Sequence, residues 1–542
     1  MTGPSHPGPT GLRFRRSAVS RSVRVLFLFA LPVGAIGSCS VYRAPEVVEV
    51  PKPSSQDSVF ISSPVRAHLL NGETILYESG IAAVRDTLYS DGTGAARRYT
   101  LSLRDGGGVG PLPLDSVVGL ESVRDRKDVA TSTLLTLLSI TAVAVPIIAC
   151  ASDPKCFGSC PTIYSDSAGT PVLEAEGFSY SIAPIFEAPD LDRLRARPDP
   201  TGAFHLEIRD EAYETHYINR LGLIEVRHDS DELALPDAAN RPVAVASLTA
   251  PLAASDRDGR NVLADLAAAD GRTYRTAPAV LARADSADSR DFVDLMFAQP
   301  ALRDTVALVF RMRNSLLNTV LLYDLMLGDP GLRSLDWVGR DLTQIGPATH
   351  LARWYVDHMG MRISVWEGGA YREVARVADT GPVAWKDVAV RIPVPSGNRL
   401  RVRLTFVADN WRIDQVRLAE RVRGPEWRPI APAEVLTAAG RPDTAALTSL
   451  RDADQAYLVT SPAQRFFLRF DVGPEPKNTV RTFLLASQGY YIEWLRGSWL
   501  STARQAATFE PSDEALVTAL QRWRSEQRDL ERQFAATRVP VR

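Results

Sequence analysis

Residues and motifs that carry enzyme chemistry are scarce in this chain. It holds 4 Cys and 7 His in 542 residues, with no HExxH pair and no phosphate-binding GK[ST] loop. A G-x-S-x-G nucleophile elbow and a GxGxxG dinucleotide fingerprint are also missing. These absences argue against the enzyme classes that depend on those motifs, and no cofactor or metal is predicted.

An excess of charge of either sign is absent as well. The 62 basic and 64 acidic residues leave a net charge of −2. This balance, without a basic cluster in the body of the chain, predicts no nucleic-acid partner. The hydrophobic content of 45% is ordinary for globular domains with a core. The length allows roughly three such domains.

Residues 25–39 (VLFLFALPVGAIGSC) form a short apolar run that follows several arginines and ends in small residues. This is the build of a secretory signal peptide. Its last four residues resemble a bacterial lipobox, in which the cysteine is lipidated. The resemblance implies a lipoprotein signal peptide over residues 1–38 and a membrane anchor on Cys39. The alternative is an ordinary signal peptide with a chance cysteine.

The residue after the cysteine refines the expected location. Ser40 is not acidic, and by resemblance to lipoproteins of bacteria with two membranes this permits transport to the outer membrane. We therefore expect a cell-envelope protein, an outer-membrane lipoprotein that faces the periplasm or the surface.

The first part of the mature chain predicts a tether and a small barrel. Residues 39–58 carry Pro and Ser without periodicity and predict a flexible tether. Residues 59–125 alternate short strands with turns, among them the hairpin pair Asn71-Gly72. This order of strands and turns resembles the small SH3-like or Sm-like barrels of bacterial envelope proteins.

Residues 129–152 carry no charge and are long enough to span a bilayer. An anchor at Cys39 would place the preceding domain outside the cytoplasm. The basic residues before the stretch, Arg124, Arg126 and Lys127, would then flank its outer side, against the positive-inside tendency. We therefore expect a hydrophobic helix that packs on protein or lies in the membrane surface. A membrane-spanning helix remains the alternative.

Cys156 and Cys160 follow with a CxxxC spacing. A zinc site needs more ligands than this region offers, and the spacing is not the CxxC of thioredoxin-like motifs. In an oxidising compartment we expect a short disulfide between Cys156 and Cys160 that pins the start of a domain. Cys150 is then left over, and a redox role for these cysteines is the alternative.

The next segment carries a recurring pattern of residues. It comprises Ser159-Cys160-Pro161, Tyr164, Glu174, Glu176, Asp210-Glu211 and Glu214-Thr215. Over residues 156–228 this pattern resembles a family of uncharacterised bacterial envelope proteins with an SCP-x-x-Y motif. The resemblance implies architecture only. We expect an antiparallel β-sheet domain over residues 156–300, with a loop-rich extension in its second half.

A second piece of the same family lies far downstream. Residues 481–491 (RTFLLASQGYY) resemble it, within a β segment that covers residues 420–510. Pairing of this segment with residues 156–228 is therefore expected. The region between them would then be an inserted domain.

Residues 305–419 show short runs of alternating apolar residues separated by Gly, Pro or Asn, which predict a β-sandwich. Their first part, TVALVFRMRNSLLNTVLLYDLML, predicts two apolar strands across a bend. The ending DNWRIDQV, residues 409–416, resembles the closing strand of galactose-binding-like jelly rolls. Members of that group bind glycans, proteins or no known ligand.

Aromatic residues of this domain are the candidate ligand-binding residues. They could form a sugar-stacking platform, or they could fill the sandwich core: Trp354, Trp366, Trp385 and Trp411. Asp409 or Asp414 could ligate a calcium ion, as in some similar sandwiches. A glycoside-active site would need two carboxylates about 5 to 10 Å apart in a cleft. The candidate acids for that reaction lie near Glu174 and Asp210.

Residues 511–536 predict an amphipathic C-terminal helix. Ser512 or Asp513 can cap it. An apolar stripe at helical spacing predicts docking on the sandwich or on a partner; it consists of Leu516, Leu520, Trp523, Leu530 and Phe534.

The sequence thus predicts a mainly β chain with a small barrel, a hydrophobic helix, an antiparallel β domain, a jelly-roll sandwich and a C-terminal helix. We expect a lipid-anchored binding or scaffold protein whose partners are envelope proteins. A glycan-binding lipoprotein that uses the jelly roll is the alternative, and a glycoside-active enzyme is the third hypothesis.

Overall fold

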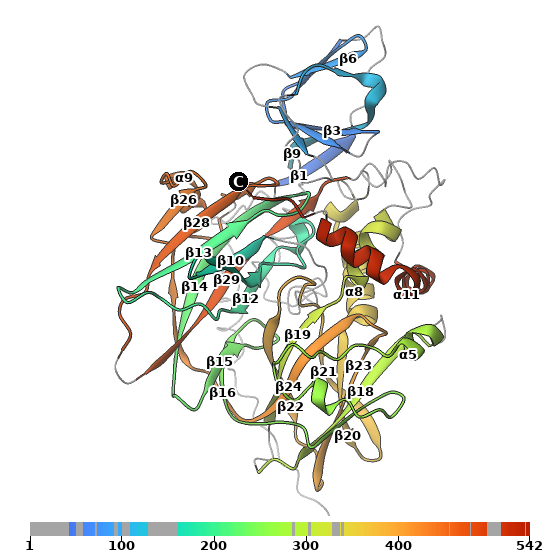
Figure 1. The fold of residues 1–542 in the computed structure, drawn as a ribbon, viewed down its shortest axis with the longest axis vertical. Coiled ribbons are helices and arrows are strands. Elements are labelled where there is room, and N and C mark those ends of the chain that lie inside the picture. Colours follow the sequence, from blue (N-terminus) through green and yellow to red (C-terminus); the bar gives the residue numbers. More distant parts are fainter. Residues whose placement is uncertain are drawn as a thin grey trace, which may run out of the picture. The chain divides into compact units, whose positions relative to one another are not determined.

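The computed structural model confirms a mainly β chain with several antiparallel sheets and a C-terminal helix (Figure 1). It describes residues 43–49, 58–70, 73–90, 96–99, 109–127, 161–284, 288–301, 305–327, 337, 341–454, 456–476, 479–495, 511–536 and 538–541.

Several sequence predictions lie outside the described residues. They concern the signal peptide, the hydrophobic stretch 129–152 and the cysteines Cys39, Cys150, Cys156 and Cys160. None of the helices in the described ranges is long and apolar enough to cross a membrane.

The N-terminal β domain has two sheets around one core. Their strand orders are β1-β9-β3-β4-β7 and β2-β5-β6-β8. On β3, Val65, Ala67 and Leu69 face the core, while Arg66 donates to Glu121 of β9 at 2.8 Å. The bounds are β1 (Arg43–Glu49), β2 (Ser58–Ile61), β3 (Val65–Leu69), β4 (Thr74–Tyr77), β5 (Ile81–Val84), β6 (Thr87–Ser90), β7 (Ala96–Tyr99), β8 (Leu112–Pro113), η1 (Leu114–Ser116) and β9 (Val117–Lys127).

Residues 161–228 and 426–495 form a second β domain, which we call the host domain. One of its sheets has the order β11-β10-β13-β28-β26, and the other has the order β12-β29-β14-β25, with β27 also paired to β14. The bounds are β10 (Thr162–Ser167), β11 (Thr170–Glu176), η2 (Pro184–Phe186), β12 (Ala188–Arg193), β13 (Ala203–Arg209), β14 (Glu214–His228), β25 (Glu426–Ile430), β26 (Glu434–Thr437), α9 (Thr444–Ser449), β27 (Leu458–Thr460), β28 (Arg465–Asp471) and β29 (Val480–Glu493).

The two chain segments of the host domain are joined by long strand ladders. β14 pairs antiparallel with β29 from Glu214 opposite Glu493 to His228 opposite Val480. β12 pairs with the other edge of β29, and β13 pairs with β28. Residues from both segments, such as Phe204 and Phe483, share one buried core. The residues between the two segments are therefore an insertion.

The insertion, residues 233–423, is a β-sandwich that we call the insert. Its first sheet has the order β15-β16-β24-β19-β22, and its second sheet has the order β17-β18-β23-β20-β21. The bounds are β15 (Leu233–Pro236), β16 (Pro242–Thr249), β17 (Ala253–Asp256), η3 (Leu263–Asp265), α5 (Pro278–Arg283), β18 (Arg290–Ala298), β19 (Thr305–Asn314), β20 (Met361–Glu367), β21 (Ala370–Val377), β22 (Lys386–Pro393), β23 (Arg399–Val407) and β24 (Trp411–Arg423).

The sandwich starts upstream of the predicted boundary at residue 305. Residues 233–298, expected as a loop-rich extension of the preceding domain, supply four of its strands. β18 alternates between buried and half-buried positions along RDFVDLMFA. Because Ala, Asp and Pro dominate the rest of this region, the alternation is easily missed in the sequence.

The prediction of a second apolar strand after β19 is wrong. After β19 the chain forms α6 (Leu317–Thr319) and the π-helix η4 (Val320–Leu327), followed by η6 (Asp341–Thr343) and α8 (Ile345–Met359). Leu317, Leu321 and Leu322 are buried together with Val320. An apolar run that is buried on several sides has no period that separates strand from helix.

These helices pack against the C-terminal helix α11 (Asp513–Ala536). Ser512 Oγ accepts the N–H of Ala515 at 3.2 Å and caps the helix. Leu516, Leu520 and Trp523 are buried in the same cluster as α8 and η4. The apolar stripe of α11 is thus used within the chain.

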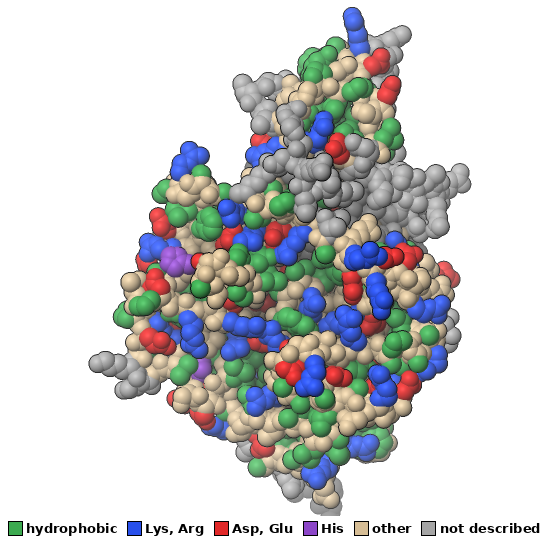
Figure 2. All heavy atoms as spheres, viewed as in Figure 1, with side chains coloured by type: hydrophobic (Ala, Val, Ile, Leu, Met, Phe, Trp, Pro, Cys, Tyr) green, Lys and Arg blue, Asp and Glu red, His purple; other side chains and the backbone are tan. Residues whose placement is uncertain are grey.

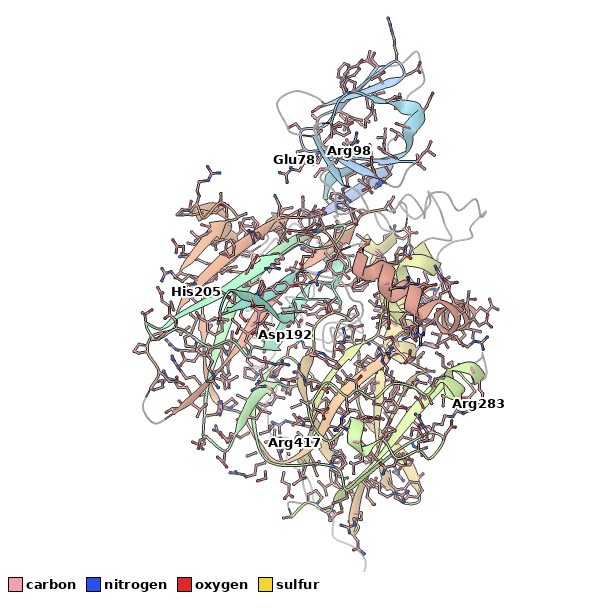
Figure 3. All side chains as sticks on the ribbon, viewed as in Figure 1. Glu78, Arg98, Asp192, His205, Arg283 and Arg417 are labelled. Atoms are coloured by element: carbon pink, nitrogen blue, oxygen red, sulfur yellow. The ribbon has the colours of Figure 1, made fainter. Side chains whose placement is uncertain are left out.

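A buried ion cluster joins the host domain to the insert. Lys386 Nζ of β22 lies 2.8 Å from Asp190 Oδ1 and 2.6 Å from Asp192 Oδ1 of β12. Figure 3 shows Asp192 on β12, among the side chains between the two domains. Burial alone would lower the pKa of Lys386, but the two carboxylates outweigh it and raise that pKa.

A second contact fixes the same junction. The carboxylate of Glu176, at the end of β11, accepts the backbone N–H groups of Val383 and Ala384 at 2.8 and 3.0 Å. Gly381 has a φ of +79°, and a Cβ there would lie 2.6 Å from the Glu176 carboxylate. The loop before β22 therefore depends on a glycine at this position.

Candidate functional site

The second sheet of the insert presents an open face of alternating side chains. Along β20, Met361, Ile363 and Val365 point into the sandwich core. Because side chains alternate along a strand, Trp366 points away from that core. The same alternation places six neighbouring side chains on this outer face, which we call the aromatic–arginine face: Phe292, Asp294, Trp366, Tyr371, Arg401 and Arg403.

Arg403 is held at the centre of this face. Its guanidinium carbon lies 3.9 Å from the ring centroid of Phe292 and 4.2 Å from that of Tyr371. Its Nε and Nη2 atoms each donate to a carboxylate oxygen of Asp294 at 2.7 Å. This hydrogen bonding to Asp294 raises the pKa of Arg403. The face is thus preorganised, with its central cation neutralised.

Trp366 lies next to this centre and is more open. Its ring stands edge-on to Tyr371, with centroids 5.1 Å apart, and the guanidinium of Arg401 lies 4.6 Å from its centroid. Trp366 is 36% exposed. Within the described residues, neither Arg399 nor Arg401 forms an ion pair. The face therefore offers an aromatic ring beside cations with free hydrogen-bond donors.

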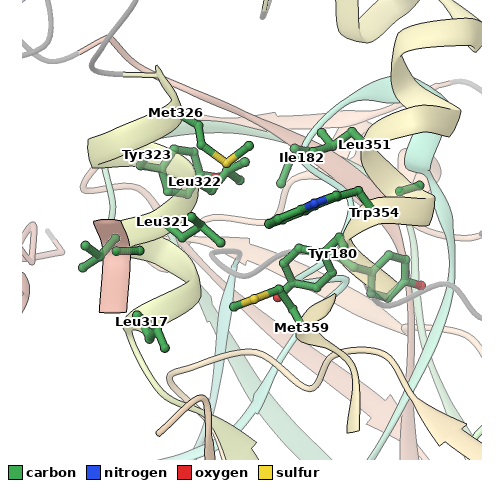
Figure 4. Packing of buried hydrophobic residues seen from close by; sticks show 14 of the residues in the cluster. Tyr180, Ile182, Leu317, Leu321, Leu322, Tyr323, Met326, Leu351, Trp354 and Met359 are labelled. Atoms are coloured by element: carbon green, nitrogen blue, oxygen red, sulfur yellow. The ribbon is translucent and has the colours of Figure 1, made fainter. Parts of the chain in front are cut away.

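The other three candidate tryptophans do not share this face. Trp411 is fully buried in the sandwich core and donates its indole N–H to Met359 O at 3.2 Å. Trp354 packs among Tyr180 and the side chains of η4 (Figure 4). Neither ring is available for stacking on a ligand, because neighbouring side chains cover both.

Trp385 is half-buried and lies immediately before β22, an edge strand of the first insert sheet. Arg311 and Arg313 of β19 lie over its ring at 5.7 and 5.0 Å. Because Trp385 packs against β19 of the first sheet and Trp366 lies on β20 of the second, they do not form one platform. Of the four predicted residues, Trp366 is the one that the structure leaves open on a sheet face.

Both predicted calcium ligands are already bound by protein donors. Asp409 accepts Arg412 at 2.8 Å and the indole N–H of Trp523 on α11 at 2.7 Å. Asp414 accepts Arg311 at 3.1 Å and the N–H of Gly271 at 3.1 Å. Among the residues that the structure describes, no group of three or more metal-ligating side chains is arranged to hold an ion. The DNWRID motif thus serves as the corner where α11 docks.

The acids considered for glycoside chemistry are likewise engaged within the fold. Glu174 accepts Ser165 Oγ and the N–H of Arg195, each at 2.7 Å. Glu211 accepts the hydroxyls of Thr162 and Tyr164, each at 2.7 Å. These carboxylates fix strands β10 and β11 and the turn after β12.

His216 belongs to a buried group of titratable residues in which a carboxylate lies near each ring nitrogen. His216 Nε2 lies 3.1 Å from Glu214, and its Nδ1 lies 3.4 Å from Asp210. Burial raises the pKa of Asp210 to about 7 and lowers that of His216. His216, Asp210 and Glu214 are at most 1% exposed. Solvent cannot reach this cluster, and no substrate can approach it.

The arginines of the aromatic–arginine face were not among the candidate residues. The run RLRVRL, residues 399–404, places an arginine at every second position, which signals one arginine-rich strand face. The contacts with Phe292 and Tyr371 join strands that are distant in the sequence. The sequence alone therefore does not reveal them.

The comparisons with known proteins leave this chain without an assigned family. No protein-family model matches it, and no curated protein matches it. Among solved structures, a GH31 alpha-xylosidase from Xanthomonas citri aligns at 9% identity and a TM-score of 0.14, over 80% of this chain and 38% of that one.

Two further structures align as weakly. Tripeptidyl peptidase 2 aligns at 6% identity and a TM-score of 0.12, over 92% of this chain and 30% of that one. A structure of infectious bursal disease virus Gx strain aligns at 8% identity and a TM-score of 0.12, over 91% of this chain and 88% of that one. The chain spans 38% and 30% of the two enzymes. Scores this low carry no argument about function.

Proposed function

We propose that this protein is a lipid-anchored binding or scaffold protein of the cell envelope. The observation that carries the proposal is the aromatic–arginine face, with Trp366 exposed beside Arg401. Trp, Tyr and Arg are the residue types that dominate the binding energy of protein interfaces. Glu174 and Glu211, two of the acids considered for glycoside chemistry, are engaged in hydrogen bonds within the fold, which supports a binding role over that reaction.

The partners in this proposal are envelope proteins with an acidic surface. Arg399 and Arg401 are exposed and lack ion pairs within the described residues, so an acidic partner would complement them. Arg403 already has its carboxylate in Asp294 and would keep the face rigid. A rigid face loses little side-chain entropy on binding.

The proposed location on the membrane rests on residues 25–39, which end in Cys39. A lipobox cysteine carries more than one acyl chain in the lipoproteins that this segment resembles. Two or more chains hold a protein durably on a membrane. The likeness to the SCP-x-x-Y envelope family supports the same address and stays a prediction.

A glycan-binding lipoprotein is the second candidate. The specific observation in its favour is that Trp366 presents a ring on an open sheet face, next to Tyr371. The apolar face of a sugar ring can stack on such an aromatic surface, with nearby arginines binding hydroxyl or carboxylate groups.

In-cell crosslinking of the intact protein, followed by identification of the captured molecules, tests both candidates. A reproducible set of proteins that is lost in Cys39→Ala would support the anchored scaffold. Recovery of polysaccharide without a protein set would favour the glycan binder. If Cys39→Ala remains fully membrane-bound, the lipid anchor is wrong, and residues 129–152 become the candidate anchor.

A further inference from the structure

A cavity lined by arginines lies in the host domain, away from the aromatic–arginine face. It has a volume of about 270 Å³ and opens beside the end of β12 and the start of β29. On the face seen in Figure 2, basic side chains gather over the region of β12. The residues that line the cavity are Arg193, Leu194, Arg195, Ala196, Arg197, Pro198, Glu475, Arg481, Thr482 and Phe483.

Arg481, the buried arginine of this cavity, is held by hydrogen bonds but has one donor without a partner. Arg481 is 5% exposed, and its Nη1 and Nη2 atoms donate to the carbonyls of Val472 and Gly473 at 3.0 and 3.1 Å. The Arg481 Nε atom is buried and has no hydrogen-bond partner among the described residues. A buried donor without an acceptor is costly, and a bound oxyanion would supply the acceptor.

Arg193, on the wall formed by β12, also has one buried donor without a partner. Its Nη1 donates to Asp387 at 3.0 Å, while its Nε is also buried without a partner among the described residues. Arg195 and Arg197 are exposed and form no ion pair within the described chain. Glu475 is the one acid among the lining residues. Arg481 also lies 3.8 Å from Glu225, and Arg193 pairs with Asp387, so the surplus of positive charge in the cavity comes from Arg195 and Arg197.

We propose that this cavity binds a phosphate group. Phosphate carries two charges near neutral pH and three terminal oxygens, which suits a cavity lined by several guanidinium groups better than a single carboxylate does. The volume holds a phosphate with part of the molecule that bears it. The phosphate belongs either to a small soluble molecule or to a lipid headgroup. This site is independent of the proposed partner surface.

The two exposed arginines allow a test that leaves the fold intact. Pyrophosphate is titrated into the purified full-length protein in detergent micelles, and binding is followed by calorimetry. Arg195→Gln with Arg197→Gln should weaken binding by tenfold or more, because two charge-assisted contacts are removed. Arg451→Gln, an exposed arginine of the host domain that does not line the cavity, is the matched control and should bind as the wild type does.

A parallel arm presents the phosphate on vesicles that contain phosphatidic acid, with phosphatidylcholine vesicles as the blank. Selective binding to the phosphatidic acid vesicles that needs Arg195 and Arg197 identifies a lipid phosphate as the ligand. Binding of pyrophosphate without such vesicle binding identifies a soluble one. If the double variant equals the wild type in both arms, or if the wild type binds neither probe, the proposal is wrong.

Discussion

Two clusters of cations and carboxylates in this protein have similar chemistry, but one is buried and the other is partly exposed. At the junction of host domain and insert, the side chain of Lys386 is 4% exposed, and those of Asp190 and Asp192 are 1% and 7% exposed. On the aromatic–arginine face, the side chains of Arg403 and Asp294 are each 29% exposed. Residue type therefore does not separate the buried structural cluster from the proposed binding surface, whereas the exposure of the side chains does.

The difference has an energetic consequence. Removing one partner of a buried ion pair leaves uncompensated charge in a low-dielectric interior, which is strongly destabilising. An exposed pair is screened by water, and its contribution to stability is small. Substitutions at the junction should therefore act on folding, and substitutions on the aromatic–arginine face should act on binding.

The largest effect is expected at Lys386. Lys386→Met leaves Asp190 and Asp192 buried without their cation and should lower the free energy of unfolding by about 3 to 5 kcal/mol. Urea unfolding measures this change. The matched control adds Asp190→Asn and Asp192→Asn to Lys386→Met and should recover part of the loss, since it removes the buried charges. A Lys386→Met protein as stable as the wild type would contradict the structural role of this cluster.

Asp210 tests a buried carboxylate that pairs with a histidine instead of a lysine. Its pKa of about 7 in the folded protein is above that of an unfolded aspartate. At low pH, Asp210 is protonated in both the folded and the unfolded protein. As the pH rises from about 4 to 7, the unfolded protein loses this proton first, so the free energy of unfolding falls. The asparagine of Asp210→Asn stays neutral at every pH. The unfolding free energy of this variant minus that of the wild type should therefore increase across that range, by up to about 4 kcal/mol.

Unfolding at a series of pH values checks this prediction. His216 acts in the opposite direction, because burial lowers its pKa, and it is present in both proteins. The groups that face it are Asp210, Glu214, Glu493 and Thr460. A stability difference between Asp210→Asn and the wild type that does not change with pH would show that Asp210 is ionised in the fold.

Trp523 tests the docking of α11. Trp523→Phe removes the indole N–H that donates to the buried Asp409 carboxylate and leaves a small cavity. We expect a loss of about 2 to 3 kcal/mol in unfolding free energy. Leu516→Met, a volume-conserving change on the same helix, should cost less. A Trp523→Phe protein with unchanged thermal stability would mean that this hydrogen bond does not hold the helix.

On the exposed side of the comparison, Arg403→Gln should have a small effect on folding. It removes the bidentate contact with Asp294 and two ring contacts, and we expect a change of about 0.2 to 1 kcal/mol in unfolding free energy. Thermal unfolding at low and high salt measures it, because salt screens an exposed pair. A loss as large as that of Lys386→Met would place this face with the structural clusters.

The mainly β class and the sandwich followed from alternating apolar residues, and these are local signals. The pairing of residues 156–228 with the segment near residue 485 needed the resemblance between two distant pieces of the chain, and β14 and β29 carry that pairing. Residues 317–327 were misjudged because burial on several sides removes the periodicity. The strands in residues 233–298 were missed because their composition resembles a loop.

The candidate site was predictable only in part. Trp366 was one of four candidate tryptophans. Its exposure depends on which residues of β20 point away from the core. The cores that cover Trp354 and Trp411 are built from segments that are far apart in the sequence. The aromatic–arginine contacts join β18, β21 and β23, so they follow from sheet order, which local patterns do not encode.

The most direct test of the account compares Trp366→Ala with Trp427→Ala in the crosslinking capture from cells. Trp427 is 52% exposed on β25 of the host domain and is the matched control. We expect both variants to fold as the wild type does, Trp366→Ala to lose the captured partner, and Trp427→Ala to retain it. Equal capture by wild type and Trp366→Ala would contradict the claim that the aromatic–arginine face is the binding surface.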